Sequence, residues 1–215
     1  MTMSRVVIIG AGGLGREVLD ILESINKHRP TYEVLGFLDD KGGDRDLLAG
    51  RGMTVLGKVE QLGSLDAQYL IAIGASEPRR RIDAFATEHG RQAAIAIHPA
   101  ATLGSDVVIG PGTIIAAGAR LTTNIKLGRH VQIHTNATVG HDADLQDYVT
   151  VLPGANVGGS VTLEQEATIG SGAVVIQGLT IGAQTTVGAG AVVVRDLPEG
   201  VTAVGVPARA LGAPS

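Results

Sequence analysis

The chain has 215 residues, a formal net charge of −4, 44% hydrophobic residues and no cysteine. This balance, without a basic cluster, argues against nucleic acid and membrane surfaces as partners, and no apolar run has the length of a membrane-spanning helix. The absence of cysteine excludes disulfides, thiolate metal ligands and a thiol acyl-enzyme intermediate. The sequence shows no secretory cleavage pattern, so we expect a cytoplasmic protein.

The first 95 residues alternate strand and helix patterns. Apolar runs at 5–10 and 32–40 flank an amphipathic pattern at 15–27. A further apolar run at 69–74 precedes a helical pattern with Ser76 as a candidate N-cap and Gly90 as a candidate stop. This order predicts a Rossmann-like α/β domain with a small, mostly parallel sheet over residues 1–95.

A glycine-rich loop follows the first predicted strand. Residues 10–15 read GAGGLG, a G-x-G-x-x-G pattern that opens a helix, where backbone N–H groups favour a diphosphate. About 95 residues are too few for the two halves of an NAD-type domain, so we favour a nucleoside diphosphate carrying a sugar. Gly12, Gly13 and Leu14 are the candidate contacts.

Two other strand ends should share this edge of the sheet, where open α/β sheets bind ligands. Asp39 and Asp40 end the second predicted strand and could accept hydrogen bonds from a base or ribose. Gly74, Ala75 and Ser76 follow another strand and complete the expected substrate contacts. The arginine run at 79–81 is interpreted as a solvated helix face.

From Ile97 the chain divides into 17 consecutive hexads, each beginning with Ile, Leu or Val, eight of them with glycine second. A period of six with one aliphatic and one small inward residue predicts a triangular solenoid of nearly six 18-residue coils. We therefore assign residues 96–215 to a parallel β-helix domain, with the segment after Pro198 as a C-terminal cap. An ice-binding surface would need a flat threonine ladder, which the mixed outer positions do not form.

The whole chain resembles a known family, the bacterial sugar O- and N-acetyltransferases of the sialic-acid acetyltransferase type, which includes enzymes that act on nucleotide-linked 4-amino sugars. The resemblance rests on segments in both regions and on the hexads: VVIIGAGGLGREV, GFLDD, IAIG, IHP, VGHDADLQDYV, LPGANVGG and VTAVGVPARAL. It implies a left-handed β-helix that binds acetyl-CoA, an N-terminal domain that binds the nucleotide-linked amino sugar, and a homotrimer with active sites between subunits.

The resemblance also implies residue roles. His141 corresponds to the general base, Asp142 to the residue that orients it, and Gly159 to the amide that contacts the thioester oxygen. Coenzyme A contacts carried over by position are Gly159, Ser171, Gly172 and Ala189. Many relatives have a histidine at the position of Leu14, so we expect one polar contact near the diphosphate to be missing here. Several relatives have a second histidine at the position of Thr150, which argues against a two-histidine mechanism in this chain.

Spacing supports this site independently of the resemblance. His141 is an outward position one 18-residue coil before Gly159, and adjacent coils lie about 4.8 Å apart, so the two residues can flank one reaction centre. Consecutive strand residues point in opposite directions, which disfavours Asp142 as the orienting residue unless it lies at a corner, and Asp144 is the second candidate.

The remaining histidines have smaller expected roles. His134 is a candidate substrate-positioning residue, while His28, His89 and His130 are expected at the surface. A zinc site from His130, His134 and His141 is disfavoured because the solenoid spreads them over different faces, so no metal is expected. Two functional alternatives stay open: an O-acetyltransferase of the same fold, and a non-catalytic trimer that binds a nucleotide sugar.

Overall fold

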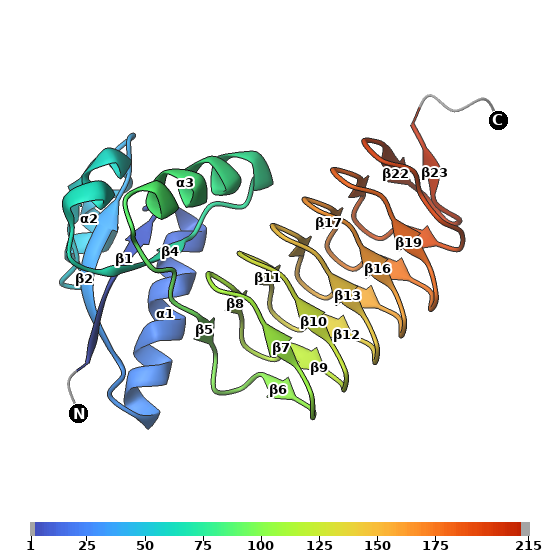
Figure 1. Ribbon diagram of the computed structural model, residues 1–215, viewed down its shortest axis with the longest axis horizontal. Helices are drawn as coiled ribbons and strands as arrows, with labels where there is room; N and C mark the ends of the chain where they lie inside the picture. The colour runs from blue at the N-terminus through green and yellow to red at the C-terminus, as the bar shows by residue number, and fades with distance from the viewer. Residues whose placement is uncertain (1–2, 212–215) are drawn as a thin grey trace. The chain divides into compact units, whose positions relative to one another are not determined.

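The computed structural model describes residues 3–211 and divides the chain into two compact units, Met1–Pro99 and Ala100–Ser215 (Figure 1). The first unit alternates helices with parallel strands, and the second is built from short parallel strands. Within residues 3–211 no helix is both long and apolar enough to cross a membrane.

The first unit contains a four-stranded sheet in the order β3-β2-β1-β4, with every neighbouring pair parallel. Its elements, in chain order, are β1 (Ser4–Ile9), α1 (Gly13–His28), β2 (Tyr32–Leu38), α2 (Arg45–Ala49), β3 (Val55–Gly57), the 3₁₀ helix η1 (Val59–Ser64), β4 (Gln68–Ile71) and α3 (Ser76–Glu88). The predicted α/β class is confirmed. The sequence patterns did not predict α2, β3 or η1, each of which is six residues or shorter.

Alternation along β1 distributes its side chains between two layers. Val7 and Ile9 belong to a buried cluster with Leu62 of η1 and Ala86 of α3. Val6 and Ile8 are equally buried and point to the opposite face, on which α1 packs. Because both faces are covered, β1 is apolar without alternation from Val6 to Ile9, as expected for a strand of a parallel sheet.

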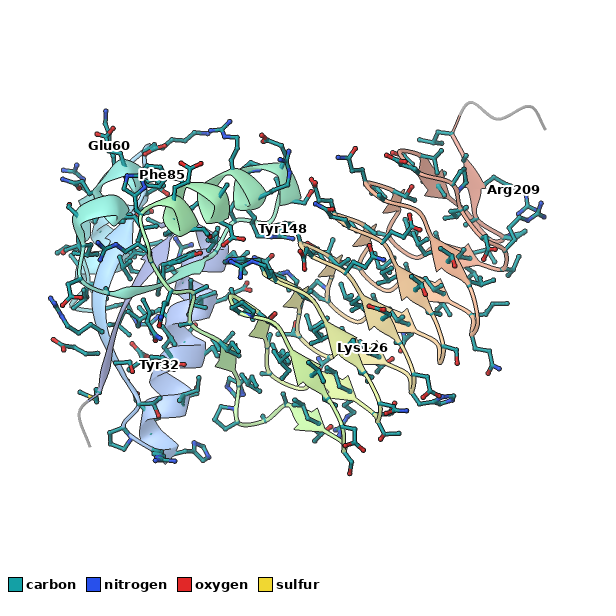
Figure 2. All side chains as sticks on the ribbon, in the orientation of Figure 1. Tyr32, Glu60, Phe85, Lys126, Tyr148 and Arg209 are labelled. Atoms are coloured by element: carbon teal, nitrogen blue, oxygen red, sulfur yellow. The ribbon has the colours of Figure 1, made fainter. Side chains whose placement is uncertain are left out.

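Two-residue strands recur every six residues from residue 96 to residue 193, in phase with the hexads. From Ile115 to Val193 the first residue of every hexad is the second residue of a strand and is buried in the coil interior, which side chains fill (Figure 2). The strands are β5 (Ala96–Ile97), β6 (Thr102–Leu103), β7 (Val108–Ile109), β8 (Ile114–Ile115), β9 (Arg120–Leu121), β10 (Lys126–Leu127), β11 (Gln132–Ile133), β12 (Thr138–Val139), β13 (Asp144–Leu145), β14 (Thr150–Val151), β15 (Asn156–Val157), β16 (Thr162–Leu163), β17 (Thr168–Ile169), β18 (Val174–Val175), β19 (Thr180–Ile181), β20 (Thr186–Val187) and β21 (Val192–Val193).

The strands form three faces. The β12 face has the order β21-β18-β15-β12-β9-β6, the β13 face β19-β16-β13-β10-β7, and the β14 face continues from β8 through β11, β14, β17 and β20 to β22 (Thr202–Val204) and β23 (Arg209–Ala210). From β6 to β21, pairing between coils joins residues 18 apart, as in Thr138 with Asn156. Each position at a corner therefore recurs directly over its equivalent in the preceding coil.

The last coil ends in a different pairing. The final strand, β23, is antiparallel to β22, whereas the pairs between successive coils are parallel. The predicted C-terminal cap includes this hairpin-like pair, and its residues 212–215 lie outside the described part of the chain.

Candidate active site

The His141 corner, which we define as the turns between the β12 and β13 faces, brings the predicted catalytic pair together. His141 and Asp142 lie in the turn between β12 and β13, and His141 Nδ1 is 2.7 Å from Asp142 Oδ2. Asp142 has a φ of +59°, a left-handed conformation that aspartate tolerates better than most residues. This turn geometry lets two consecutive side chains meet, which an extended strand would not allow.

The charge on Asp142 defines which imidazole nitrogen carries the proton. Hydrogen bonds from His141 and then Asn124 hold the pKa of the Asp142 carboxyl below its ordinary value. An ionised carboxylate only accepts hydrogen bonds, so His141 Nδ1 must be the donor. In the neutral ring Nε2 therefore keeps its lone pair and can accept a proton.

Gly159 lies against this basic nitrogen, one coil further along the chain. A Cβ atom built on Gly159 would be 2.6 Å from His141 Nε2, closer than real Cβ atoms approach other atoms. The backbone at Gly159 does not have a positive φ, so the glycine is needed for space and not for conformation. In residues 3–211 no hydrogen bond uses the Gly159 amide as donor.

A single subunit does not bring every predicted contact to this corner. Ser171, Gly172 and Ala189 are exposed in the turns from the β14 face to the β12 face, and His134 lies at the start of an earlier turn in the same column. The β12 face separates these four residues from His141. They belong to a second corner, which we call the Ser171 corner.

His130 corrects the expectation of a surface histidine. Its side chain is buried, and its ring stacks on that of Tyr148 (labelled in Figure 2), with the ring centroids 5.9 Å apart. It lies in a turn between the β13 and β14 faces, so His130, His134 and His141 occupy three different corners. Among residues 3–211 no group of three or more His, Cys, Asp or Glu side chains could hold a metal ion.

The glycine loop of the first unit runs from the end of β1 into α1. Gly15 is required by packing, because a Cβ there would collide with the carbonyl oxygen of Gly10. Gly12 and Gly13 are exposed, and a Cβ on either would meet nothing within 4 Å. Helix α1 has neither a side-chain cap nor an acidic residue in its first turn, so its amides are available to an anion.

Asp39 is bound largely to its own chain. Its Oδ2 accepts the Ala11 amide at 2.8 Å, and its Oδ1 accepts the amides of Lys41 and Gly42 at 2.7 and 3.0 Å. Asp40 is exposed and accepts the Val59 amide at 3.0 Å. Asp39 therefore holds the backbone of the glycine loop, and its contact with a base or ribose stays a prediction.

Arg79 corrects the expectation of a solvated arginine run. Its side chain is fully buried and donates to the carbonyl oxygens of Ile73 and Gly74 at 3.0 and 2.7 Å. Arg81, by contrast, is exposed and lies 3.8 Å from Glu77. Arg79 thus holds the loop that contains Gly74, Ala75 and Ser76 at the carboxyl edge of the sheet, and Ala75 rather than Ser76 is the N-cap of α3.

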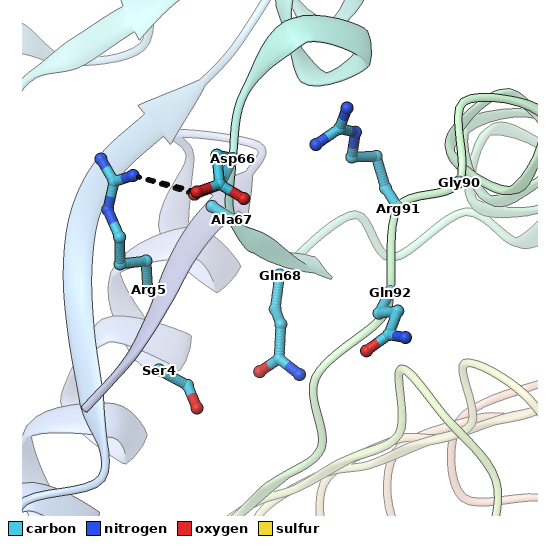
Figure 3. Close-up of a pocket in the computed structure, with 8 residues that line it drawn as sticks. All are labelled: Ser4, Arg5, Asp66, Ala67, Gln68, Gly90, Arg91 and Gln92. Atoms are coloured by element: carbon cyan, nitrogen blue, oxygen red, sulfur yellow. Dashed lines mark hydrogen bonds and ion pairs between the residues drawn. The ribbon is translucent and has the colours of Figure 1, made fainter. Parts of the chain in front are cut away.

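One hollow of the first unit lies away from these residues. The pocket in Figure 3 has a volume of about 380 Å³ and lies at the amino ends of β1 and β4, beside Arg5, Gln68 and Arg91. The glycine loop follows the carboxyl end of β1. This pocket is therefore separate from the predicted nucleotide-sugar contacts.

The chain combines a glycine loop in an α/β unit with a solenoid of six-residue repeats that has a histidine–aspartate pair at one corner. Residues 5–83 match the family described as the PglD N-terminal domain. The GDP-perosamine N-acetyltransferase of Escherichia coli O157:H7 is 35% identical over 151 residues, which span 67% of this chain and 66% of that protein.

Solved structures resemble the chain over nearly its full length. One is a histidine-to-asparagine variant of perosamine N-acetyltransferase from Caulobacter crescentus in complex with CoA and GDP-perosamine, with 35% identity, a TM-score of 0.89 and 98% of each chain covered. Another is the acetyltransferase domain of PglB from Neisseria gonorrhoeae FA1090, with 33% identity, a TM-score of 0.88, and 97% of this chain and all of that one covered. The chain belongs to the sugar acetyltransferases with a left-handed β-helix, a family of enzymes, which confirms the resemblance and the predicted fold.

Proposed function

We propose that the protein transfers the acetyl group of acetyl-CoA to the amine of a nucleotide-linked 4-amino-4,6-dideoxy sugar, with GDP-perosamine as the favoured acceptor. The observation that carries the proposal is the His141–Asp142 pair, whose free Nε2 lies against Gly159. The relatives named for GDP-perosamine acetylation support the choice of acceptor.

In the proposed reaction the amine attacks the thioester carbonyl directly. A C–N bond forms, the amine proton passes to His141 Nε2, and the Gly159 amide donates to the oxyanion. The C–S bond then breaks, and the protonated imidazole returns the proton to the departing sulfur, which leaves as free coenzyme A thiol. Asp142 stabilises the imidazolium and keeps its ring in place, as a buried aspartate does in serine hydrolases.

In a homotrimer with active sites between subunits, the His141 corner of one subunit and the Ser171 corner of another could contribute to the same active site. Ser171, Gly172 and Ala189 are candidate coenzyme contacts but lie across the β12 face from His141. A neighbouring subunit could supply its Ser171 corner to the His141 corner of the first. His134, on that same second corner, would then position the substrate.

The first unit would hold the nucleotide part of the acceptor. Gly12 and Gly13 offer open space and unpaired helix amides for the diphosphate, and Leu14 lies in the same turn. Asp40 and the loop of Gly74, Ala75 and Ser76 lie at the same edge of the sheet. Because acetyl-CoA is a cytoplasmic metabolite, the proposed location is the cytoplasm.

The test is release of free coenzyme A thiol from acetyl-CoA with a panel of GDP- and UDP-linked 4-amino sugars. We expect rapid release of the thiol with a GDP-linked amino sugar, and a product that is stable to mild base. Release only with UDP-linked sugars would keep the mechanism and change the acceptor. A base-labile product would show O-acetylation, and tight nucleotide-sugar binding without thiol release from any acceptor would overturn catalysis.

A further inference from the structure

The carboxylate of Asp142 is bound at both oxygens, although its side chain is 49% exposed. Oδ2 faces His141 Nδ1, and Oδ1 accepts a hydrogen bond from Asn124 Nδ2 at 2.9 Å. A carboxylate at the surface rotates easily when only one oxygen is held. With both oxygens held, the plane of the group is fixed.

The solenoid explains why Asn124 lies at this position. Asn124 is 18 residues before Asp142, in the preceding turn of the His141 corner, and the two have nearly the same φ, +62° and +59°. Each donates its backbone amide to the coil before it, Asn124 to Ser105 and Asp142 to Thr123, both at 3.1 Å. The side chains therefore start from equivalent, adjacent backbone sites.

The chemistry of this contact selects asparagine. An ionised carboxylate needs a donor, which the amide NH₂ supplies. Aspartate at 124 would place a second negative charge against Asp142, and alanine would supply no donor and be strained at this φ. Asparagine is also among the few residues that adopt the left-handed conformation readily.

We propose that Asn124 is a positioning residue: it fixes the Asp142 carboxylate and, through it, the tautomer and orientation of His141. Asn124 gives its side-chain hydrogen bond to Asp142 and not to His141, and in the proposed reaction it contacts no substrate. The catalytic consequence rests on the proposed function, whereas the effect on the imidazole does not.

Glycine variants test the inference without backbone strain, because glycine accepts a positive φ. Asn124→Gly and Asp142→Gly, singly and together, form a double-mutant cycle. Asp106→Gly is the matched control, since Asp106 occupies the same corner one coil earlier with a φ of +57°. Two quantities are measured: the steady-state constants for thiol release, and the imidazole tautomer of His141 by ¹⁵N NMR in the resting protein.

We expect Asn124→Gly to lower kcat by about three- to tenfold, the net effect of losing one hydrogen bond of ordinary strength at a solvent-exposed site, with little change in KM. It should also reduce the fraction of the Nδ1–H tautomer, and Asp106→Gly should change neither. In the Asp142→Gly background, Asn124→Gly should have no further effect on kcat.

Two results would overturn the inference: equal behaviour of Asn124→Gly and Asp106→Gly in both measurements, or the same loss of kcat from Asn124→Gly with and without Asp142. If the wild type released no thiol with any acceptor, the proposed function would fail. The tautomer comparison would still decide the role of Asn124.

Discussion

The imidazole of His141 fills the space into which a side chain at Gly159 would project, with Nε2 2.6 Å from the position of that Cβ. Gly159→Ala should therefore displace the ring from its place beside the Gly159 amide. We expect kcat for thiol release to fall by about ten- to a hundredfold, because small displacements of reacting groups are costly. The measurement is steady-state kinetics beside a thermal melt.

Gly188→Ala is a matched control for that variant. Gly188 is another β-helix glycine without a positive φ, and its Cβ would be 2.8 Å from a side-chain methyl carbon of Val204. Normal kinetics in both variants would show that the ring position is unimportant for turnover. Equal kinetic losses would trace the effect to the fold of the solenoid.

His141→Asn removes the proposed base and preserves a polar side chain of similar reach. Thiol release should slow by about 100-fold or more, as expected for lost general-base catalysis, while nucleotide-sugar binding measured by calorimetry stays near the wild-type value. Near-normal turnover would remove His141 from the mechanism. Loss of sugar binding with normal folding would reassign it to substrate recognition.

Alanine substitutions in the glycine loop at 10–15 should have two different effects. Gly15→Ala should prevent stable folding of the first unit, because its Cβ would collide with the Gly10 carbonyl. Gly12→Ala should leave the melting temperature nearly unchanged, since nothing lies within 4 Å of its Cβ, and should raise KM for the nucleotide sugar severalfold. An unchanged KM in a folded Gly12→Ala protein would argue against a diphosphate at this loop.

Asp39→Asn should destabilise the glycine loop, because it alters the acceptor of several backbone hydrogen bonds. The amide can replace only part of the set of acceptors that holds Ala11, Lys41 and Gly42, so we expect a loss of about 1–3 kcal/mol in the free energy of unfolding. Asp40→Asn, which affects one bond on an exposed side chain, should cost less. Chemical denaturation compares the two, and the reverse order would contradict the assignment.

The Asp142 carboxyl should titrate below the ordinary aspartate range near 3.9. A folded-state pKa below the unfolded one stabilises the protein above the unfolded pKa, and this stabilisation is lost as the pH falls through the folded pKa. The stability difference between wild type and Asp142→Asn should therefore shrink on acidification. A carboxyl NMR titration gives the pKa, and a value above 3.9 would contradict the hydrogen-bonded arrangement.

The repeat made the β-helix predictable in detail. A six-residue period determines which side chain faces inward, so the sequence alone predicted the phase of the strands and the 18-residue offset between His141 and Gly159. The histidine–aspartate contact was harder to foresee, because it depends on the left-handed turn at Asp142. The contact of Asn124 was predictable in principle, because an asparagine one coil before Asp142 is placed to donate to its carboxylate.

The errors concern residues whose burial depends on tertiary packing. Arg79 lies in a run of three arginines, and only the position of α3 against the loop after β4 decides that this one is buried. His130 follows the solvent-facing pattern of a turn, yet its ring is covered. Composition predicts exposure for both residue types, and specific hydrogen bonds or ring stacking override that preference.

The corner that holds His141 draws on three successive coils, at Asn124, Asp142 and Gly159. An insertion of one residue between these positions would exchange the inward and outward positions of the strands that follow, unless a turn accommodated the extra residue. A whole extra coil beyond Val193 would leave the corner untouched. The solenoid could therefore be lengthened at its C-terminal end by 18 residues at a time. The number of residues from Asn124 to Gly159 cannot change in this way, because the site needs these residues in adjacent coils.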